Sequence, residues 1–129
     1  MSNNIPTDLK YAPSQEWVKA EADGTLTVGI THHAQDALGD LVFIELPAVG
    51  KQLKAGQEAV VLESVKAASD AYSPVAGVVV AVNQAVADSP ESLNAAPYDS
   101  WLFKLQPAAD ATTDAMLDAA GYAANIGQA

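Results

Sequence analysis

The 129-residue sequence contains no cysteine and no arginine. The lack of cysteine excludes disulfides, thiolate nucleophiles, iron–sulfur ligation and Cys-based zinc sites, so any sulfur redox chemistry must arrive on a cofactor. Because arginine is missing, all six basic side chains are lysines, and they face 16 acidic ones, giving a formal net charge of −10. Nucleic acid and anionic membranes are bound mainly by clusters of Lys and Arg, so neither is an expected partner.

Long apolar runs and a targeting segment are also missing. The longest apolar stretches, residues 41–44 and 75–82, are far shorter than a membrane span, and the first six residues show no basic region followed by an apolar one. We therefore expect a cytoplasmic protein. Its length suits a single domain over residues 1–129, with residues 1–8 as a loose lead-in.

Short strands separated by turn-forming residues dominate the remaining pattern. Asp23-Gly24 predicts a hairpin between the first two strands, and the alternation of Leu26, Val28 and Ile30 indicates a half-buried strand. About seven strands are predicted, over residues 17–21, 25–31, 41–46, 58–65, 71–73, 78–82 and 101–105. Such spacing, with little helix, favours a mainly β protein built as a small sandwich or barrel.

Three short helical segments are expected beside these strands. Thr31 is placed to cap a helix that ends near Gly39, and residues 88–94 predict one helical turn with Ser89 as its cap. The Ala-rich stretch 110–120, followed by Gly121, predicts a C-terminal helix.

Few residues suggest catalysis. His32 and His33, with Asp36 and Asp40 nearby, fall short of the three or four convergent ligands that a zinc site requires. No nucleophile elbow and no phosphate-binding Gly-rich loop are present. The residues alone do not indicate an enzyme.

The segment 60–72 is unusual, because two strand-like runs meet at Lys66 without the Gly, Asn or Pro that turns normally contain. The lysine is flanked by small side chains at positions 67–69, with Glu63 and Asp70 nearby. Most such lysines are hydrated surface groups. The alternative is an acylation site, where an exposed amine on a rigid hairpin is modified and loses its charge.

Glu63-Ser64-Val65-Lys66-Ala67 resembles the lipoyl-attachment motif of the glycine cleavage system H protein family. The resemblance extends in order over roughly residues 9–105. Further matching segments are Leu9-Lys10-Tyr11, Glu16-Trp17, Val28-Gly29-Ile30-Thr31, His33-Ala34-Gln35, Leu38-Gly39-Asp40, Leu46-Pro47 with Gly50, Ser73-Pro74 with Gly77, Val82-Asn83, Asn94, Pro97-Tyr98 and Trp101. An ordered set of this length is far more specific than the five-residue motif alone. Two positions depart from the family pattern: Gln15 replaces a usual His, and Ser100 replaces a Gly.

The resemblance implies a barrel-sandwich hybrid fold and a non-catalytic carrier with lipoate attached covalently at Lys66 as lipoyl-lysine. Such a carrier takes the aminomethyl group of glycine from glycine decarboxylase (P protein) to aminomethyltransferase (T protein) in one-carbon metabolism. Dihydrolipoamide dehydrogenase (L protein) reoxidises it, and lipoate-attaching enzymes load it. The resemblance also implies a cleft that shelters the loaded arm, with Glu16, His33 and Asp70 at the matching positions.

Other roles stay open at this point. The nearest are the lipoyl domain of a 2-oxoacid dehydrogenase, a biotin carrier, and a relay that passes lipoate to other proteins. Biotin carriers typically have Met on both sides of the lysine, whereas this chain has Val65 and Ala67. A β-sandwich interaction module without a prosthetic group is the alternative from a different class.

Overall fold

The computed structural model describes residues 6–12, 14–109, 111 and 116–125. Its strands are β1 (Lys10–Tyr11), β2 (Glu16–Ala20), β3 (Leu26–Ile30), β4 (Leu41–Glu45), β5 (Gln52–Leu53), β6 (Glu58–Ser64), β7 (Ala68–Tyr72), β8 (Gly77–Val82) and β9 (Phe103–Pro107). Its helices are α1 (His32–Leu38), α2 (Gln84–Asp88), α3 (Glu91–Ala95) and α4 (Ala119–Asn125). The mainly β architecture with short helices agrees with the prediction from sequence.

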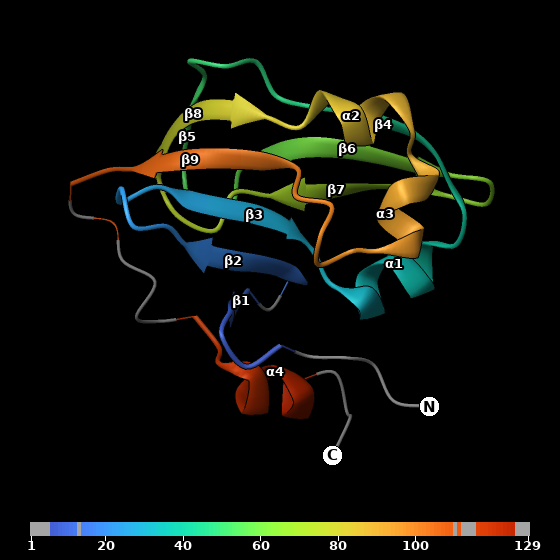
Figure 1. The fold of residues 1–129 in the computed structure, drawn as a ribbon, viewed down its shortest axis with the longest axis horizontal. Helices are drawn as coiled ribbons and strands as arrows, with labels where there is room; N and C mark the ends of the chain where they lie inside the picture. The colour runs from blue at the N-terminus through green and yellow to red at the C-terminus, as the bar shows by residue number, and fades with distance from the viewer. Residues whose placement is uncertain (1–5, 13, 110, 112–115, 126–129) are drawn as a thin grey trace.

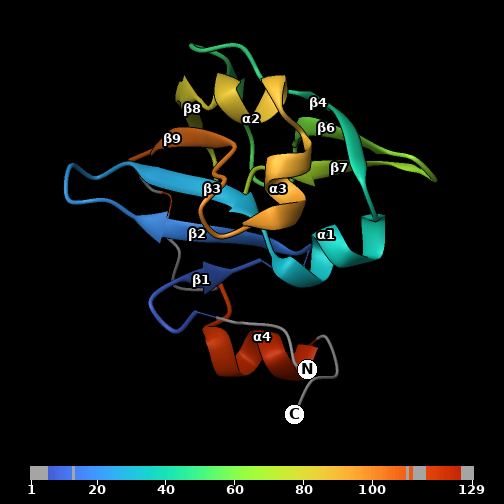
Figure 2. The same ribbon diagram turned by 45° about the vertical axis from the view of Figure 1, so that its right-hand side comes forward.

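The strands form two antiparallel sheets that face each other (Figure 1). The larger sheet has the order β1-β2-β3-β9-β8-β5, and the smaller has the order β4-β6-β7. Among the described residues the two sheets share no strand ladder, so the sandwich does not close into a barrel. Helices α1, α2 and α3 gather at the end where the β6–β7 hairpin projects (Figures 1 and 2).

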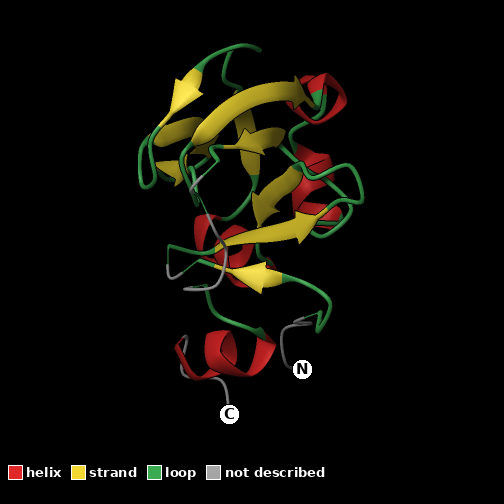
Figure 3. Ribbon diagram, turned by 90° about the vertical axis from the view of Figure 1, so that its left-hand side faces the viewer, coloured by secondary structure: helices red, strands yellow, loops and turns green. Residues whose placement is uncertain are grey.

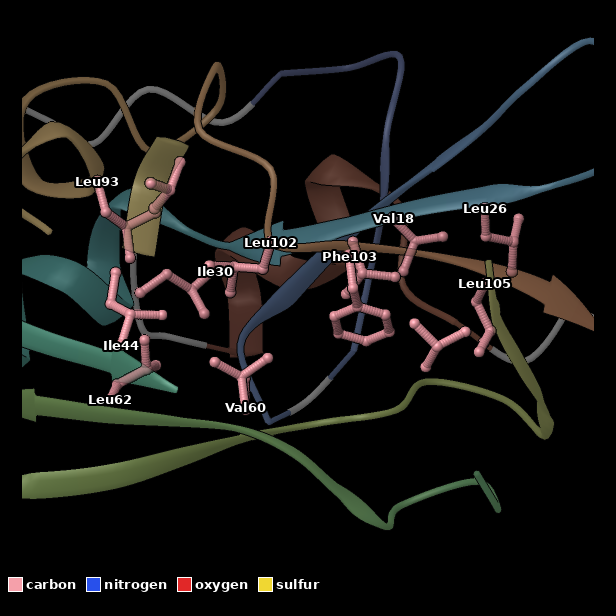
Figure 4. Close-up of a cluster of buried hydrophobic side chains, with 14 of the residues drawn as sticks. Val18, Leu26, Ile30, Ile44, Val60, Leu62, Leu93, Leu102, Phe103 and Leu105 are labelled. Atoms are coloured by element: carbon pink, nitrogen blue, oxygen red, sulfur yellow. The ribbon is translucent and has the colours of Figure 1, made fainter. Parts of the chain in front are cut away.

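The core fills the space between the two sheets. Figure 4 shows Phe103 and Leu105 of the larger sheet and Val60 of the smaller one in the space between the sheets, and all three side chains are buried. Ile44 and Leu62 pair across β4 and β6 and extend the same cluster. Because successive residues of a strand alternate between its faces, the small sheet buries one face and leaves the other outside the sandwich.

Several local predictions are confirmed. The Thr31 hydroxyl accepts a hydrogen bond from the Ala34 N–H (3.2 Å) at the start of α1, and Gly39 ends that helix with φ +86°. Asp23-Gly24 forms the turn between β2 and β3, with Gly24 at φ +90°. Glycine adopts this left-handed backbone without steric cost, which is why it occurs at the helix end and in the tight hairpin.

Other boundaries were wrong. The strands expected at 71–73 and 101–105 are β7, at 68–72, and β9, at 103–107, while β1, β5 and α2 were not predicted. Helix α3 starts after Pro90 without a side-chain cap, and the Ser89 carbonyl oxygen accepts a hydrogen bond from the Ser92 hydroxyl (2.7 Å). Strands and helices this short contain too few residues for a hydrophobic periodicity to be recognised in the sequence.

The C-terminal helix begins at Ala119 and continues through Gly121, whereas the sequence predicted residues 110–120. Of that range, 110 and 112–115 lie outside the described residues, as do residues 1–5 of the expected lead-in. Leu117 is held extended because it exchanges backbone hydrogen bonds with Tyr11 (2.7 and 2.8 Å). Asp118 then accepts a hydrogen bond from the Gly121 N–H (2.8 Å), so an Asp that the sequence placed inside the helix acts as its cap.

A second, smaller cluster of buried side chains ties α4 to β1 and β2. Figure 3 shows the C-terminal helix at one end of the molecule. The rings of Tyr11 and Tyr122 stack with centroids 4.7 Å apart, and both side chains are fully buried. The Tyr122 hydroxyl lies 2.6 Å from the Thr31 hydroxyl and donates to Gln15 Oε1 (3.0 Å). The C-terminal helix therefore contacts the N-terminal cap of α1 and the segment that precedes β2.

The Trp17 indole packs on the backbone of β3. Trp17 is paired with Gly29 across β2 and β3, and its Nε1 donates to the Pro97 carbonyl oxygen (3.0 Å). A Cβ built on Gly29 would lie 2.5 Å from both Cε2 and Cζ2 of Trp17. Position 29 therefore requires glycine, because the Trp17 ring lies too close to its backbone to leave room for a side chain.

We predict that Gly29→Ala lowers the free energy of unfolding by about 2 to 3 kcal/mol, because the added methyl forces the buried indole to move. Urea denaturation measures this loss. Trp17→Phe removes the clashing part of the ring, so the double variant should cost less than the sum of the two single variants. Full additivity would contradict the proposed contact.

Candidate functional site

Lys66 lies at the tip of the hairpin between β6 and β7, in a loop of three exposed residues that projects from one end of the molecule (Figures 1 and 2). The Ser64 side chain replaces the turn-forming residues that the sequence lacks. Its hydroxyl oxygen accepts hydrogen bonds from the N–H groups of Lys66 (3.3 Å) and Ala67 (3.1 Å) and donates to the Ala67 carbonyl oxygen (3.1 Å). The loop that presents the amine is therefore fixed by a local serine contact.

The same loop is fastened to the neighbouring segment. The Val65 N–H donates to the Asp40 carbonyl oxygen (3.0 Å), and Ser64 is paired with Leu41 on β4. A Cβ built on Gly39 would lie 3.2 Å from Cε of Lys66, so the lysine stem runs beside the end of α1. The exposed side chain of Lys66 therefore extends from a fixed base.

Asn94, from α3, holds that neighbouring segment in place. Its Oδ1 accepts a hydrogen bond from the Leu41 N–H (2.8 Å). Its Nδ2 donates to the Gly39 carbonyl oxygen (2.8 Å) and to Gln35 Oε1 (2.8 Å). One side-chain amide thus joins α3, the end of α1 and the start of β4.

A cleft of about 210 Å³ lies between α1 and the strands β2, β3, β6 and β7. It brings together all three residues that the family resemblance assigned to a sheltering cleft, Glu16, His33 and Asp70. The rest of its lining is Ser14, Gln15, Ile30, Ala34, Ala37, Leu38, Leu62 and Ser69. The lining contains two carboxyl groups and no lysine, between apolar walls.

Glu16 is the most enclosed carboxyl group of this cleft. It is buried, its Oε2 accepts a hydrogen bond from the Tyr72 N–H (3.1 Å), and its Oε1 accepts one from the Ser14 hydroxyl. Desolvation raises the pKa of Glu16 above its usual value of 4.5, and the hydrogen bonds from Ser14 and Tyr72 only partly oppose that effect. The cleft therefore contains one carboxyl group, that of Glu16, whose ionised form is destabilised by burial, and a second, that of Asp70, which is half-buried.

Electrostatics and shape suit this cleft to a small cation on an apolar stem. A primary ammonium is attracted by Glu16 and Asp70, while an aliphatic chain is accommodated by side chains such as Ile30 and Leu62. Gln15, which replaces the family's usual His, also lines the cleft and has a left-handed backbone with φ +83°. This departure from the family pattern therefore lies in the lining of the cleft.

The sequence did not indicate how two residues fix the site. Ser64 lies in the segment that resembles the lipoyl-attachment motif, and a serine just before a turn without Gly or Asn is typical of a side-chain-stabilised turn, but this contact was not predicted. Asn94 was expected near the end of a helical turn, and nothing in the local pattern indicates its long-range contacts. His32 Nδ1 lies 3.2 Å from Gln35 Nε2, and within the described ranges no group of three metal-ligating side chains forms.

A family model described as Glycine cleavage H-protein matches residues 9–128. The chain belongs to this family. Curated H proteins of the glycine cleavage system are similar throughout: one from Thiobacillus denitrificans is 65% identical and covers 92% of both chains. The glycine cleavage system H protein 2 of Pseudomonas aeruginosa is 62% identical and covers 96% of both.

The H-protein fold is also found in a solved structure. The crystal structure of a glycine cleavage system H protein from Mycobacterium marinum superposes with a TM-score of 0.87, at 40% identity, covering 95% of this chain and 99% of that one. The predicted lipoyl-carrier type of fold is therefore confirmed, with two open sheets in place of a closed barrel. No helix in the described part of this H-protein family member is both long and apolar enough to cross a membrane.

The buried carboxyl group makes stability depend on pH. Because the pKa of Glu16 is raised in the folded state, the folded chain binds the proton more tightly, and stability falls as pH rises from the usual carboxyl pKa to the raised one. One pH unit between the two pKa values corresponds to about 1.4 kcal/mol. We predict that Glu16→Gln gains stability relative to the unsubstituted chain across this window, measured by urea denaturation between about pH 4 and pH 8. A difference that does not change with pH would contradict the assignment.

Proposed function

We propose that this chain is the non-catalytic lipoyl carrier of a glycine cleavage system. It takes the aminomethyl group of glycine from glycine decarboxylase to aminomethyltransferase and is reoxidised by dihydrolipoamide dehydrogenase. The observation that carries the proposal is the exposed Lys66 at the tip of a fixed hairpin, beside a carboxyl-lined cleft. Membership in the H-protein family supports it.

The amine of Lys66 is the attachment point in this proposal. In its neutral form, Nζ attacks the carbonyl carbon of an activated lipoyl group such as an acyl adenylate. The amide C–N bond forms, the C–O bond to the phosphate breaks, AMP leaves and the displaced proton goes to solvent. The exposed loop leaves Nζ accessible, and the hydrogen bonds of Ser64 keep its base in one place.

Once attached, lipoate supplies a dithiolane that opens to accept a carbon group with two electrons, a role the Cys-free chain has no sulfur to perform. The chain contributes presentation and protection. An arm of lysine plus lipoate reaches about 14 Å, the span of some four extended residues, which suits delivery into recessed active sites. The acidic surface favours brief contact with basic partner entrances.

The cleft is the proposed resting place of the loaded arm. Glu16 and Asp70 attract its ammonium group, and the walls formed by Ile30 and Leu62 exclude water from it. His33, on α1, lines the same cleft. The cytoplasmic location expected from the sequence stays a prediction.

We predict that Lys66→Ala abolishes modification and glycine turnover, because the remaining lysines do not lie on this hairpin. Intact mass after incubation with lipoate, Mg·ATP and a lipoate ligase should show one added lipoyl group on the unsubstituted chain and none on the variant. Lys54→Ala is the matched control, since Lys54 is also exposed in a turn, and it should be modified normally. An unmodified wild-type chain would favour an interaction module without a prosthetic group.

The sheltering cleft is tested separately. We predict that Asp70→Asn releases ammonia from the loaded carrier several times faster than the unsubstituted protein, because one of the two carboxylates facing the ammonium is lost. Asp99→Asn, an exposed Asp outside the cleft, should leave the rate unchanged. Equal release rates for all three proteins would contradict the sheltering role without affecting the attachment site.

A further inference from the structure

The outer face of the small sheet carries an apolar patch beside the lysine hairpin, which we call the β4 patch and define as Val42, Phe43 and Val65. These side chains are 56%, 46% and 70% exposed, respectively. Five large apolar side chains are exposed in the described part of the chain, and the other two are Val49 and Val80. Three of the five thus gather at one end of one sheet.

A β-bulge produces the patch. Leu41 pairs with Ser64 and Phe43 pairs with Glu63, so Val42 is an extra residue with no partner of its own on β6. Strict alternation would turn Phe43 toward the core. The bulge instead leaves Val42 and Phe43 both outside, while Leu41 and Ile44 stay buried. Exposing an aromatic ring beside a valine is costly in water, and such local irregularities commonly position side chains for binding.

The patch is continuous with the lysine loop. The Asp40 carbonyl oxygen accepts the Val65 N–H (3.0 Å), which places the start of β4 directly beside the loop that holds Lys66. An enzyme that forms a bond to Nζ of the bare lysine must approach within the reach of one side chain. Partners of the loaded carrier instead meet the end of a much longer arm, so they need not cover this surface.

Charges around the patch are almost all of one sign. The small sheet and its hairpin carry four acidic side chains and a single basic one: Glu45, Glu58, Glu63 and Asp70 against Lys66. Glu45, Glu58 and Asp70 also line a groove of about 440 Å³, whose lining includes a single lysine, Lys51. A protein bound here must therefore present apolar side chains surrounded by Lys or Arg.

We propose that the β4 patch is the docking surface for the enzyme that acylates Lys66. That enzyme covers Val42, Phe43 and Val65 with an apolar surface that has a basic rim, and so brings the activated acyl group to Nζ. The inference rests on the proposed function, since it takes acylation of Lys66 as given. It adds the surface through which the acylating enzyme recognises the unmodified carrier.

The test measures acylation of the apo carrier by intact mass, with a purified lipoate ligase, lipoate and Mg·ATP, as a function of carrier concentration. Val42→Thr and Phe43→Thr keep residues that favour strands, so the fold is retained, as thermal unfolding verifies. Each should raise KM for the carrier at least fivefold with kcat within twofold, and the double variant should raise KM more than twentyfold.

Val80→Thr is the matched control. Val80 is 43% exposed and also occupies a bulge, between the pairs Val79–Leu105 and Ala81–Lys104 of the larger sheet. Its KM should stay within twofold of the unsubstituted chain. Equal KM values for Phe43→Thr and Val80→Thr would overturn the docking surface, and a KM that does not rise with salt would overturn the basic rim.

These outcomes distinguish failure of the docking surface from failure of the carrier function. If Lys66 is acylated and the β4 patch variants behave like the control, only the docking inference fails. If the unsubstituted chain is never acylated, the proposed function fails and the inference fails with it. Phe43→Tyr, which keeps an aromatic ring on the patch, should restore KM to within threefold and so distinguishes lost apolar contact from a distorted strand.

Discussion

The side-chain amide of Asn94 connects the parts of the molecule that position the lysine. Its three hydrogen bonds, all of 2.8 Å, fix Gln35 in α1, the Gly39 carbonyl and the Leu41 N–H. The segment held in this way provides the Asp40 carbonyl that binds the loop before Lys66. An amide offers both donors and an acceptor in a planar group, which a carboxylate or a hydroxyl does not. Loss of any of the three contacts would leave partly buried polar groups without partners.

Local sequence was enough to predict features that depend on near neighbours. Thr31 as a cap, Gly39 as a helix end and Asp23-Gly24 as a turn each follow from the conformation that one or two residues prefer. Tertiary contacts decided the remaining boundaries. Leu117 is held extended by backbone hydrogen bonds to Tyr11, which lies more than a hundred residues earlier in the chain. Helix α4 therefore begins only after Leu117. No period within residues 110–120 contains that information.

The functional site likewise combines one feature that local sequence indicates with others that depend on tertiary contacts. Lys66 stands out because two strand-like runs meet at it, whereas the cleft around Glu16 assembles residues from β2, α1 and β7 that are far apart in sequence. Family resemblance named Glu16, His33 and Asp70, but it did not indicate that Glu16 is buried and bound by Ser14 and Tyr72. The bulge at Val42 could not be predicted from the sequence either, because a residue is extra only in relation to the strand with which it pairs.

The fixed base of the lysine loop has a thermodynamic consequence for the cleft. A group tethered to a stationary point samples a small volume, so its effective concentration near the protein surface is on the order of millimolar or higher. A resting site with only millimolar intrinsic affinity is then occupied for much of the time. Such a weak site would release the proposed lipoyl arm quickly, and a partner enzyme would remove the arm without opposing a large binding energy.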